Sequence, residues 1–406
     1  MRGRTGALSV VLAHCAVALS FAALAQSDAH KAPRDTSSCL APGAWHILDP
    51  SGPRPTPAAE LLALASRRDI VLLGERHDEY DHHAWQLQTL AALHALRPRM
   101  VIGFESFPRR VQGTLDKWVA GELTEGQFLE RSDWEKVWNL PSGLYMPLFQ
   151  FARINRIPMV ALNVDRELTQ QITHKGWDGV PTERREGVSR PAPASQAYRD
   201  VLFEIYKEHP QAREKSGDIR KDDPDFLHFI DSQTTWDRAM AEALAHRVAG
   251  ASGTARPMVV GIVGAGHISN GYGVPHQLRD LGISSIATLL PVDAAGSCNK
   301  LASGFADAVF ALPAVAQEAS RKPRLGISLQ RTGNGIEVLD VIGGSLAEST
   351  GIRKGDLIES VAGYAVTQTG GVIAAVRSQP AGTWLPMTVR RDGKRLDLIV
   401  KFPPPS

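Results

Sequence analysis

The fold class is decided by the stretch IVLLGERH, residues 70–77. Its first four residues are continuously apolar, which is typical of a strand buried on both faces of a parallel sheet. Similar apolar runs occur at residues 100–104, 157–162, 258–263 and 284–290. Helical patterns lie between them, at residues 83–96, 148–156 and 235–248. Strands that alternate with helices predict an α/β domain with a mostly parallel sheet and flanking helices.

Polar residues follow four of these strands in succession. Glu75 and His77 come after the first strand, Glu105 after the second, Asn163 and Asp165 after the third and His267 after the fourth. The carboxyl ends of parallel strands lie along one edge of a sheet, where ligands bind. We therefore expect these side chains to converge, although chance polarity of loops is the alternative interpretation.

Two kinds of chemistry fit this set of residues. Glu75, His77 and His267 are of the ligand types that hold Zn, Mn or Co with an open position. The same three residues and Glu105 could instead perform acid/base catalysis without a metal. Either way, the residues alone predict a hydrolase site.

A family resemblance enters through motifs spread over roughly residues 45–292. The motifs are LLGERH at 72–77, DHH at 81–83, GFE at 103–105, Tyr145 with Pro147, ALN at 161–163, Gln233 with Asp237 and Met240, GAGH at 264–267 and GYGVP at 271–275. Together they resemble the ChaN family of the haem-binding-uptake/Tiki superfamily, over a domain expected at residues 40–295. The resemblance implies an exported haem-binding protein of iron uptake. The wider superfamily also includes metal-dependent proteases and esterase-like hydrolases, so fold alone does not choose the function.

Haem, the cofactor that this resemblance implies, needs an apolar slot and an axial ligand. The candidate ligands near the expected crevice are Tyr145, His82, His83 and Tyr272. The chain has no C-x-x-C-H motif, so covalent attachment of a c-type haem is excluded. Three further histidines, His174, His209 and His228, are expected to be solvent-facing or structural.

Two further segments complete this part of the chain. Residues 170–225 interrupt the strand and helix alternation, and we expect a helical insertion that forms a flap beside the crevice or a mobile surface excursion. Residues 296–322 are rich in alanine and show no clear strand, so they are predicted to be a linker with a helical piece.

The C-terminal residues 323–403 have a different character. Asn334-Gly335 predicts a hairpin turn. The block from Ala347 to Ile358, A-x-x-x-G-I-x-x-G-D-x-I, resembles a bacterial-type PDZ domain, which implies a small β-rich fold. Leu325, Gly326 and Ile327 stand where such a domain binds a C-terminal carboxylate. The expected partner is the C-terminal tail of an exported or outer-membrane protein; a β domain that only packs against the first is the alternative.

The N-terminus predicts export. Arg2 and Arg4 precede an apolar run that ends in a small-residue cleavage signal, so residues 1–25 read as a signal peptide and the location as periplasmic or extracytoplasmic. In an oxidising compartment Cys39 and Cys298 are expected to form a disulfide, with two free thiols as the alternative.

Composition sets limits on the possible partners. The 406 residues carry a net charge of +2, from 45 basic and 43 acidic residues, which does not call for nucleic acid. A dimer remains possible. Three functions stay open: a haem-binding protein docked through its PDZ domain, a metal-dependent hydrolase or protease of the Tiki/erythromycin-esterase-like type, and a non-catalytic scaffold.

Overall fold

The computed structural model describes residues 40–208, 219–249, 256–296, 301–313, 323–333 and 335–404. The expected signal peptide, residues 1–25, and the expected disulfide residues Cys39 and Cys298 lie outside these ranges. The described residues form two sheets, each with a core of its own. None of the helices in these ranges is long and apolar enough to cross a membrane.

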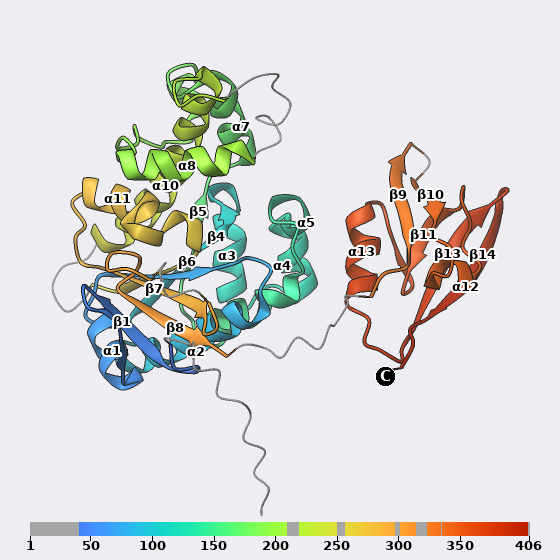
Figure 1. The fold of residues 1–406 in the computed structure, drawn as a ribbon, viewed down its shortest axis with the longest axis horizontal. Coiled ribbons are helices and arrows are strands. Elements are labelled where there is room, and N and C mark those ends of the chain that lie inside the picture. Colours follow the sequence, from blue (N-terminus) through green and yellow to red (C-terminus); the bar gives the residue numbers. More distant parts are fainter. Residues whose placement is uncertain are drawn as a thin grey trace, which may run out of the picture. The chain divides into compact units, whose positions relative to one another are not determined.

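The first sheet has eight strands in the order β2-β1-β8-β7-β3-β6-β4-β5 (Figure 1). Its strands are β1 (Trp45–Asp49), β2 (Gly52–Thr56), β3 (Ile70–Glu75), β4 (Met100–Pro108), β5 (Met159–Asn163), β6 (Met258–Gly264), β7 (Ile286–Asp293) and β8 (Ala308–Leu312). The strands from β8 to β5 are parallel to their neighbours, whereas β1 pairs antiparallel with both β2 and β8. The predicted mostly parallel α/β sheet is confirmed.

All five predicted strands are present, and three more extend the sheet. β2 reads GPRPT and holds two prolines, which a strand tolerates only where its N–H groups are not needed, as at the edge where β2 lies. β8 comes from within residues 296–322, which we expected to be a linker. That part of the expectation is wrong: five small and apolar residues pair with β7 and β1, a contact that their alanine-rich sequence does not reveal.

The apolar runs are continuous because the sheet is covered on both faces. In β3, Val71 and Leu73 belong to one core cluster, and Ile70 and Leu72 belong to another. The first cluster includes residues of α1 (Ala58–Ala65), α2 (Tyr80–Leu96), α3 (Gln112–Val119), α4 (Glu125–Arg131), α5 (Trp134–Val137) and α6 (Met146–Ile154). The second includes residues of α10 (Pro224–Ala249) and α11 (Gly273–Asp280). Side chains that alternate along a strand therefore all find an apolar layer.

A helical insertion follows β5, as predicted. It contains α7 (Arg166–Lys175), a 3-10 turn (Thr182–Arg184) and α8 (Gln196–Lys207), and the chain then enters α10. Two small cores of its own hold it, one around Ile172 and Trp177 and one around Tyr206 and Phe226. The insertion is thus packed against the long α10 (Figure 1).

The C-terminal domain is an antiparallel sheet in the order β14-β13-β11-β10-β9, with β12 paired to β11. Its strands are β9 (Ile327–Thr332), β10 (Gly335–Val341), β11 (Leu357–Val361), β12 (Tyr364–Ala365), β13 (Trp384–Arg391) and β14 (Lys394–Lys401). Two helices complete it, α12 (Leu346–Thr350) and α13 (Thr369–Arg377). β9 lies at one edge of this sheet, and α13 contacts it.

Candidate functional site

The carboxyl ends of the central strands bring two glutamates together. Glu75 is the last residue of β3, and Glu105 lies near the end of β4. β6 runs between these two strands and ends at Gly264, which pairs with Glu75 in the parallel register. Glu105 Oε2 accepts a hydrogen bond of 2.6 Å from the Gly264 backbone N–H. Both carboxylates are buried, so the predicted convergence at one sheet edge is confirmed.

The Glu75 carboxylate binds a tyrosine and a histidine. Tyr145 Oη donates to Glu75 Oε1 at 2.5 Å, and His77 Nδ1 lies 2.8 Å from the same oxygen. Because an ionised carboxylate only accepts hydrogen bonds, His77 Nδ1 carries the proton. His83 Nδ1 lies 3.3 Å from the other oxygen of Glu75. Tyr145, Glu75 and His77 form the first of two similar units.

The second unit contains Tyr198, Asp237 and His267. His267 Nδ1 lies 2.6 Å from Asp237 Oδ1, and Tyr198 Oη donates to Asp237 Oδ2 at 3.0 Å. The Nε2 atoms of both units point to one atom, Glu105 Oε1, at 3.6 Å from His267 and 4.0 Å from His77. That oxygen is buried and accepts no hydrogen bond from any described residue. Two tyrosine–carboxylate–histidine units therefore meet at one carboxylate.

Buried charges set the protonation of these units. Burial disfavours the charged form of His267, but Glu105 and Asp237 outweigh it and raise its pKa to about 9. Burial likewise opposes the charge on His77, yet its hydrogen bond to Glu75 and the charge of Glu105 raise its pKa. Burial raises the pKa of Glu75, but the contacts with His77, His83 and Tyr145 outweigh this effect. The pKa of Glu75 therefore lies below its ordinary value. These shifts all favour the charged forms of Glu75, His77 and His267.

Gly264 is required by the close approach of His77. A Cβ atom on residue 264 would lie 2.8 Å from His77 Cε1 and 2.9 Å from His77 Nε2. Real side chains do not reach such distances, so any other residue would displace the imidazole from Glu105. Gly264, the first glycine of the GAGH motif, is therefore needed to leave room for the His77 side chain. It is not needed for a turn of the backbone.

The other predicted haem ligands occupy different surroundings. His82 is buried, and its Nδ1 accepts the Arg76 backbone N–H at 2.9 Å; burial and the Arg76 charge lower its pKa. His83 is buried as well and contacts the backbone oxygen of His77 through Nε2 at 3.1 Å. Tyr145 is only 1% exposed. Tyr272 stacks on Tyr198 at 5.4 Å between ring centroids.

Sequence reasoning missed the part played by Tyr198 and Asp237. Asp237 entered only as a member of a family motif, and Tyr198 lay within the expected insertion at residues 170–225 with no role of its own. Asp237 is fully buried on α10. A lone acidic residue on the buried face of a helix is costly without a partner, and that is the signal that could have indicated a polar site.

A hollow of about 1500 Å³ lies beside this cluster. Trp138 and Trp236 line it, and their rings pack edge-on against His77 and His267, at 4.8 Å and 4.7 Å between centroids. None of Glu75, His77, Glu105 and His267 is among its described lining residues. The remaining walls come from the end of β4, from residues 163–165 at and just after the end of β5, from α5, α7 and α10, and from residues 184 and 186. The two tryptophans thus separate the polar cluster from the hollow.

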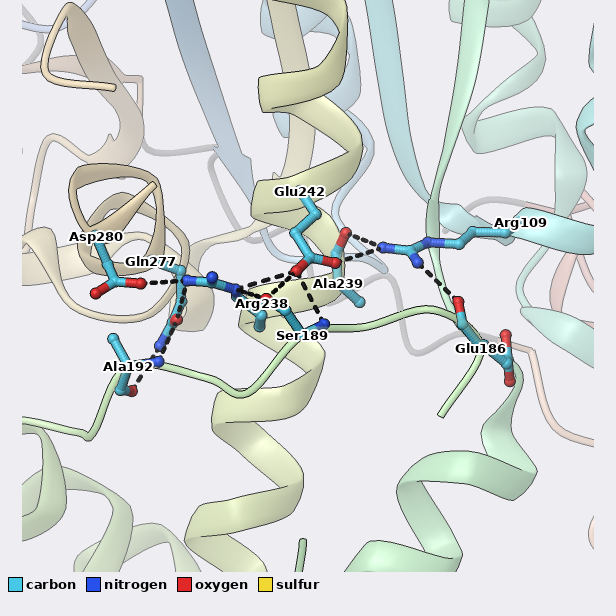
Figure 2. A network of polar contacts seen from close by, with 9 residues as sticks. All are labelled: Arg109, Glu186, Ser189, Ala192, Arg238, Ala239, Glu242, Gln277 and Asp280. Carbon is cyan, nitrogen blue, oxygen red and sulfur yellow. Dashed lines mark hydrogen bonds and ion pairs between the residues drawn. The ribbon is translucent and has the colours of Figure 1, made fainter. Parts of the chain in front are cut away.

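The wall at residues 184 and 186 continues into an extended strap, residues 186–192, which side chains fix in place (Figure 2). Gln277 binds both backbone groups of Ala192, with hydrogen bonds of 2.8 and 2.9 Å. Glu242 accepts from the backbone N–H of Ser189 at 3.0 Å. Arg109 donates to the backbone oxygen of Glu186 at 3.0 Å.

Arg238 holds this arrangement together from α10. Its guanidinium lies 3.2 Å from Glu242 Oε1 and 2.5 Å from Asp280 Oδ2, and it donates to Ser189 Oγ at 2.9 Å (Figure 2). Arg238 and Glu242 are both buried, so the ion pair is little screened by water. The strap is therefore fixed to α10 and α11, and with it one wall of the hollow.

The second candidate site is the loop before β9. Its backbone is held by α12 and the turn before it: Ala347 N–H donates to the Leu325 oxygen at 2.9 Å, and Ile342 N–H to the Gly326 oxygen at 2.8 Å. Gly326 has φ +79°, and a Cβ there would lie 2.4 Å from the Cβ of Ser345. Only glycine fits this loop, which leads directly into the edge strand β9.

Two family models match the chain, one over each domain. The model of the family described as haem-binding uptake, Tiki superfamily, ChaN matches residues 61–278, more than half of the chain. The chain belongs to the ChaN family. A PDZ domain model matches residues 323–402, so the ChaN-family domain is followed by a PDZ domain.

One solved structure supports the α/β fold, and two others are similar to a smaller part of the chain. The structure of cofacial haem binding to ChaN of Campylobacter jejuni is 19% identical, covers 66% of this chain and 96% of that chain, and has a TM-score of 0.50. The PDZ region is similar to the HtrA3 PDZ domain bound to a phage-derived ligand, at 24% identity, 20% and 84% coverage and a TM-score of 0.18. A serine endoprotease from Yersinia pestis matches at 24% identity, 21% and 30% coverage and a TM-score of 0.19.

The metal site predicted at Glu75, His77 and His267 receives no support in the ChaN-family domain. Among the described residues, no group of three or more His, Cys, Asp or Glu side chains is arranged to hold a metal ion. The reason is visible in the geometry: Glu75 faces His77 Nδ1, so it lies behind that imidazole and not beside the Nε2 atoms that face Glu105.

Proposed function

We propose that this ChaN-family chain is an exported haem-binding protein of haem or iron acquisition, which docks to a partner through its PDZ domain. The observation that carries the proposal is the aromatic-walled hollow at the carboxyl edge of the sheet. Ligands of open parallel sheets bind at this edge. Support comes from the ChaN family match and from the Campylobacter jejuni ChaN structure, which has haem bound.

The residues of the hollow fit a haem. Trp138, Trp236 and Phe229 supply flat apolar surface, and Val164 and Leu168 extend it. Arginine and lysine side chains also line the hollow and suit the propionates of haem. Haem, once bound, would supply a coordinated iron, whereas these side chains would bind, orient and shield the ring from water.

Export and the PDZ partner complete the proposal. The expected signal peptide, residues 1–25, would bring the chain to the periplasm, where Cys39 and Cys298 would pair. There the loop Leu325–Ile327 and the edge strand β9 would bind the C-terminal tail of an exported or outer-membrane protein. Bringing the haem carrier to its source or acceptor is the role we assign to this docking.

Titration of the full exported chain with haemin, followed by the Soret band, tests the proposal. We expect saturable binding that weakens in the Trp138→Ala and Trp236→Ala variants. Loss of one aromatic wall costs about 1.5–3 kcal/mol, which is about a tenfold or larger loss of affinity. Trp384→Ala is the matched control, because Trp384 is exposed in the PDZ domain.

Elemental analysis of the same sample distinguishes the hydrolase alternative. The absence of saturable haemin binding by the wild type, together with a stoichiometric divalent metal that is lost in Glu75→Ala or His267→Ala, would overturn the proposal. It would assign the polar cluster to hydrolysis by Glu75, His77, Glu105 and His267.

A further inference from the structure

The hollow contains one side chain of a kind that ligates haem iron. Histidine, tyrosine, methionine and cysteine are the usual protein ligands. Among the described residues that line the hollow, His174 alone is of these types. It lies in the last turn of α7, its side chain is exposed, and no described residue binds its imidazole.

The ligands that sequence reasoning favoured are engaged elsewhere. Tyr145 donates to Glu75 and is buried, and His82 accepts a backbone hydrogen bond. His83 contacts the backbone of His77. None of them lines the hollow in the described structure. Each would have to leave a buried hydrogen bond to reach iron, which is costly, whereas His174 would not.

Two arginines of the hollow are free to bind anions. Arg166, at the start of α7, and Arg184, just before the strap, line the hollow, are exposed and form no ion pair with a described carboxylate. Arg110 also lines it but is held by Asp165 at 2.7 Å and Asp133 at 3.1 Å. Arg166 and Arg184 are thus the arginines there that can take the carboxylates of a ligand.

Arg166 and His174 lie near opposite ends of α7. Arg166 and His174 are eight residues apart on α7, which corresponds to about 12 Å along the helix. Arg184 lies two residues before the strap, whose backbone is held by Arg109 and Glu242. The iron ligand and the anion partners therefore stand at separate points around the same space.

We propose, building on the proposed haem function, that His174 is the axial iron ligand and that Arg166 and Arg184 bind the two haem propionates. The sequence had suggested a solvent-facing or structural role for His174. The exposed imidazole is instead the one available ligand among the described walls of the hollow.

Haemin titration of the full chain, with absorbance and electron paramagnetic resonance spectra, tests the iron ligand. His174→Ala is expected to lose the spectral signature of a nitrogen ligand and to bind haemin about tenfold or more weakly. Added imidazole should restore the wild-type spectrum. His246→Ala is the matched control, because His246 is also an exposed histidine on a helix but does not line the hollow.

The arginines are tested with haemin and haemin dimethyl ester, whose propionates carry no charge. Arg166→Gln and Arg184→Gln should each weaken haemin binding about two- to fivefold, the range of an exposed ion pair. The same two substitutions should leave binding of the ester unchanged. The control Arg247→Gln should change the binding of neither ligand.

The possible outcomes distinguish a wrong assignment of the haem-binding residues from a wrong haem-binding function. If the wild type binds haemin but His174→Ala keeps the wild-type spectrum and affinity, the ligand assignment is wrong and the haem function stands. If the arginine variants weaken the ester as much as haemin, the propionate assignment is wrong. If the wild type binds no haemin, both the function and the inference fall.

Discussion

The two candidate sites of this chain are built in opposite ways. At the sheet edge, side chains from β3, β4, α10 and the turn after β6 meet around Glu105. In the PDZ domain, three consecutive residues, Leu325–Ile327, form the loop whose backbone we propose to bind a C-terminal carboxylate. The first site is broken by removing a side chain, and the second by adding one. This contrast gives each site its own sensitive substitution.

The largest effect is expected at Asp237, which is fully buried. Asp237→Ala would leave the cationic His267 and the hydroxyl of Tyr198 without their partner. Breaking a buried pair in this way costs about 3–5 kcal/mol of the free energy of unfolding. Guanidinium denaturation measures this loss of stability, and hydrogen exchange of peptides from β6 shows whether it affects the site.

The control for this prediction is Asp222→Ala. Asp222 pairs with Arg220 at the surface, where both side chains are 71% exposed. Its loss should change stability by no more than about 1 kcal/mol. Equal effects of the two substitutions on stability would show that Asp237 does not form the buried unit with Tyr198 and His267.

The next effect concerns pH. The pKa of His267 is about 9 in the folded chain and 6.5 when unperturbed. The folded state therefore binds the extra proton more tightly, and this contribution is complete below pH 6.5 and is lost as pH rises through 9. The loss amounts to roughly 3 kcal/mol.

Denaturation curves between pH 6 and pH 9.5 measure this loss, and His267→Gln provides the comparison. The wild type should become less stable toward high pH, and the variant should show a smaller slope. A slope that is the same in both chains would mean that His267 is not the group that releases the proton.

The smallest effect on stability is expected in the PDZ loop. Gly326→Ala adds a methyl group 2.4 Å from Ser345 Cβ at φ +79°. Backbone strain of this kind costs about 1–3 kcal/mol. It should also abolish binding of fluorescent peptides with a free C-terminal carboxylate, which the wild type should prefer over amidated peptides.

Gly343→Ala is the control for the PDZ loop. Gly343 has no atom within 4 Å of an added Cβ and does not have positive φ. This variant should keep the stability and the peptide binding of the wild type. If Gly326→Ala also keeps them, the loop does not bind the carboxylate through its backbone.

The sequence by itself determined five strands of the α/β sheet, their buried character and the residues that gather at the sheet edge. Apolar runs ending in Glu75, Glu105 and Gly264 suffice for this, because the carboxyl ends of parallel strands share one edge. The PDZ domain was equally readable, since its loop and turns are local and glycine positions mark them.

Tertiary structure alone decided which groups pair and which face open space. Tyr145 and His174 could not be ranked from sequence, because burial and partners come from segments far apart in the chain. The same holds for Tyr198, which reaches Asp237 from the insertion, and for β8, whose place depends on β1 and β7. Local patterns fix an element, whereas long-range packing fixes the environment that gives a side chain its chemistry.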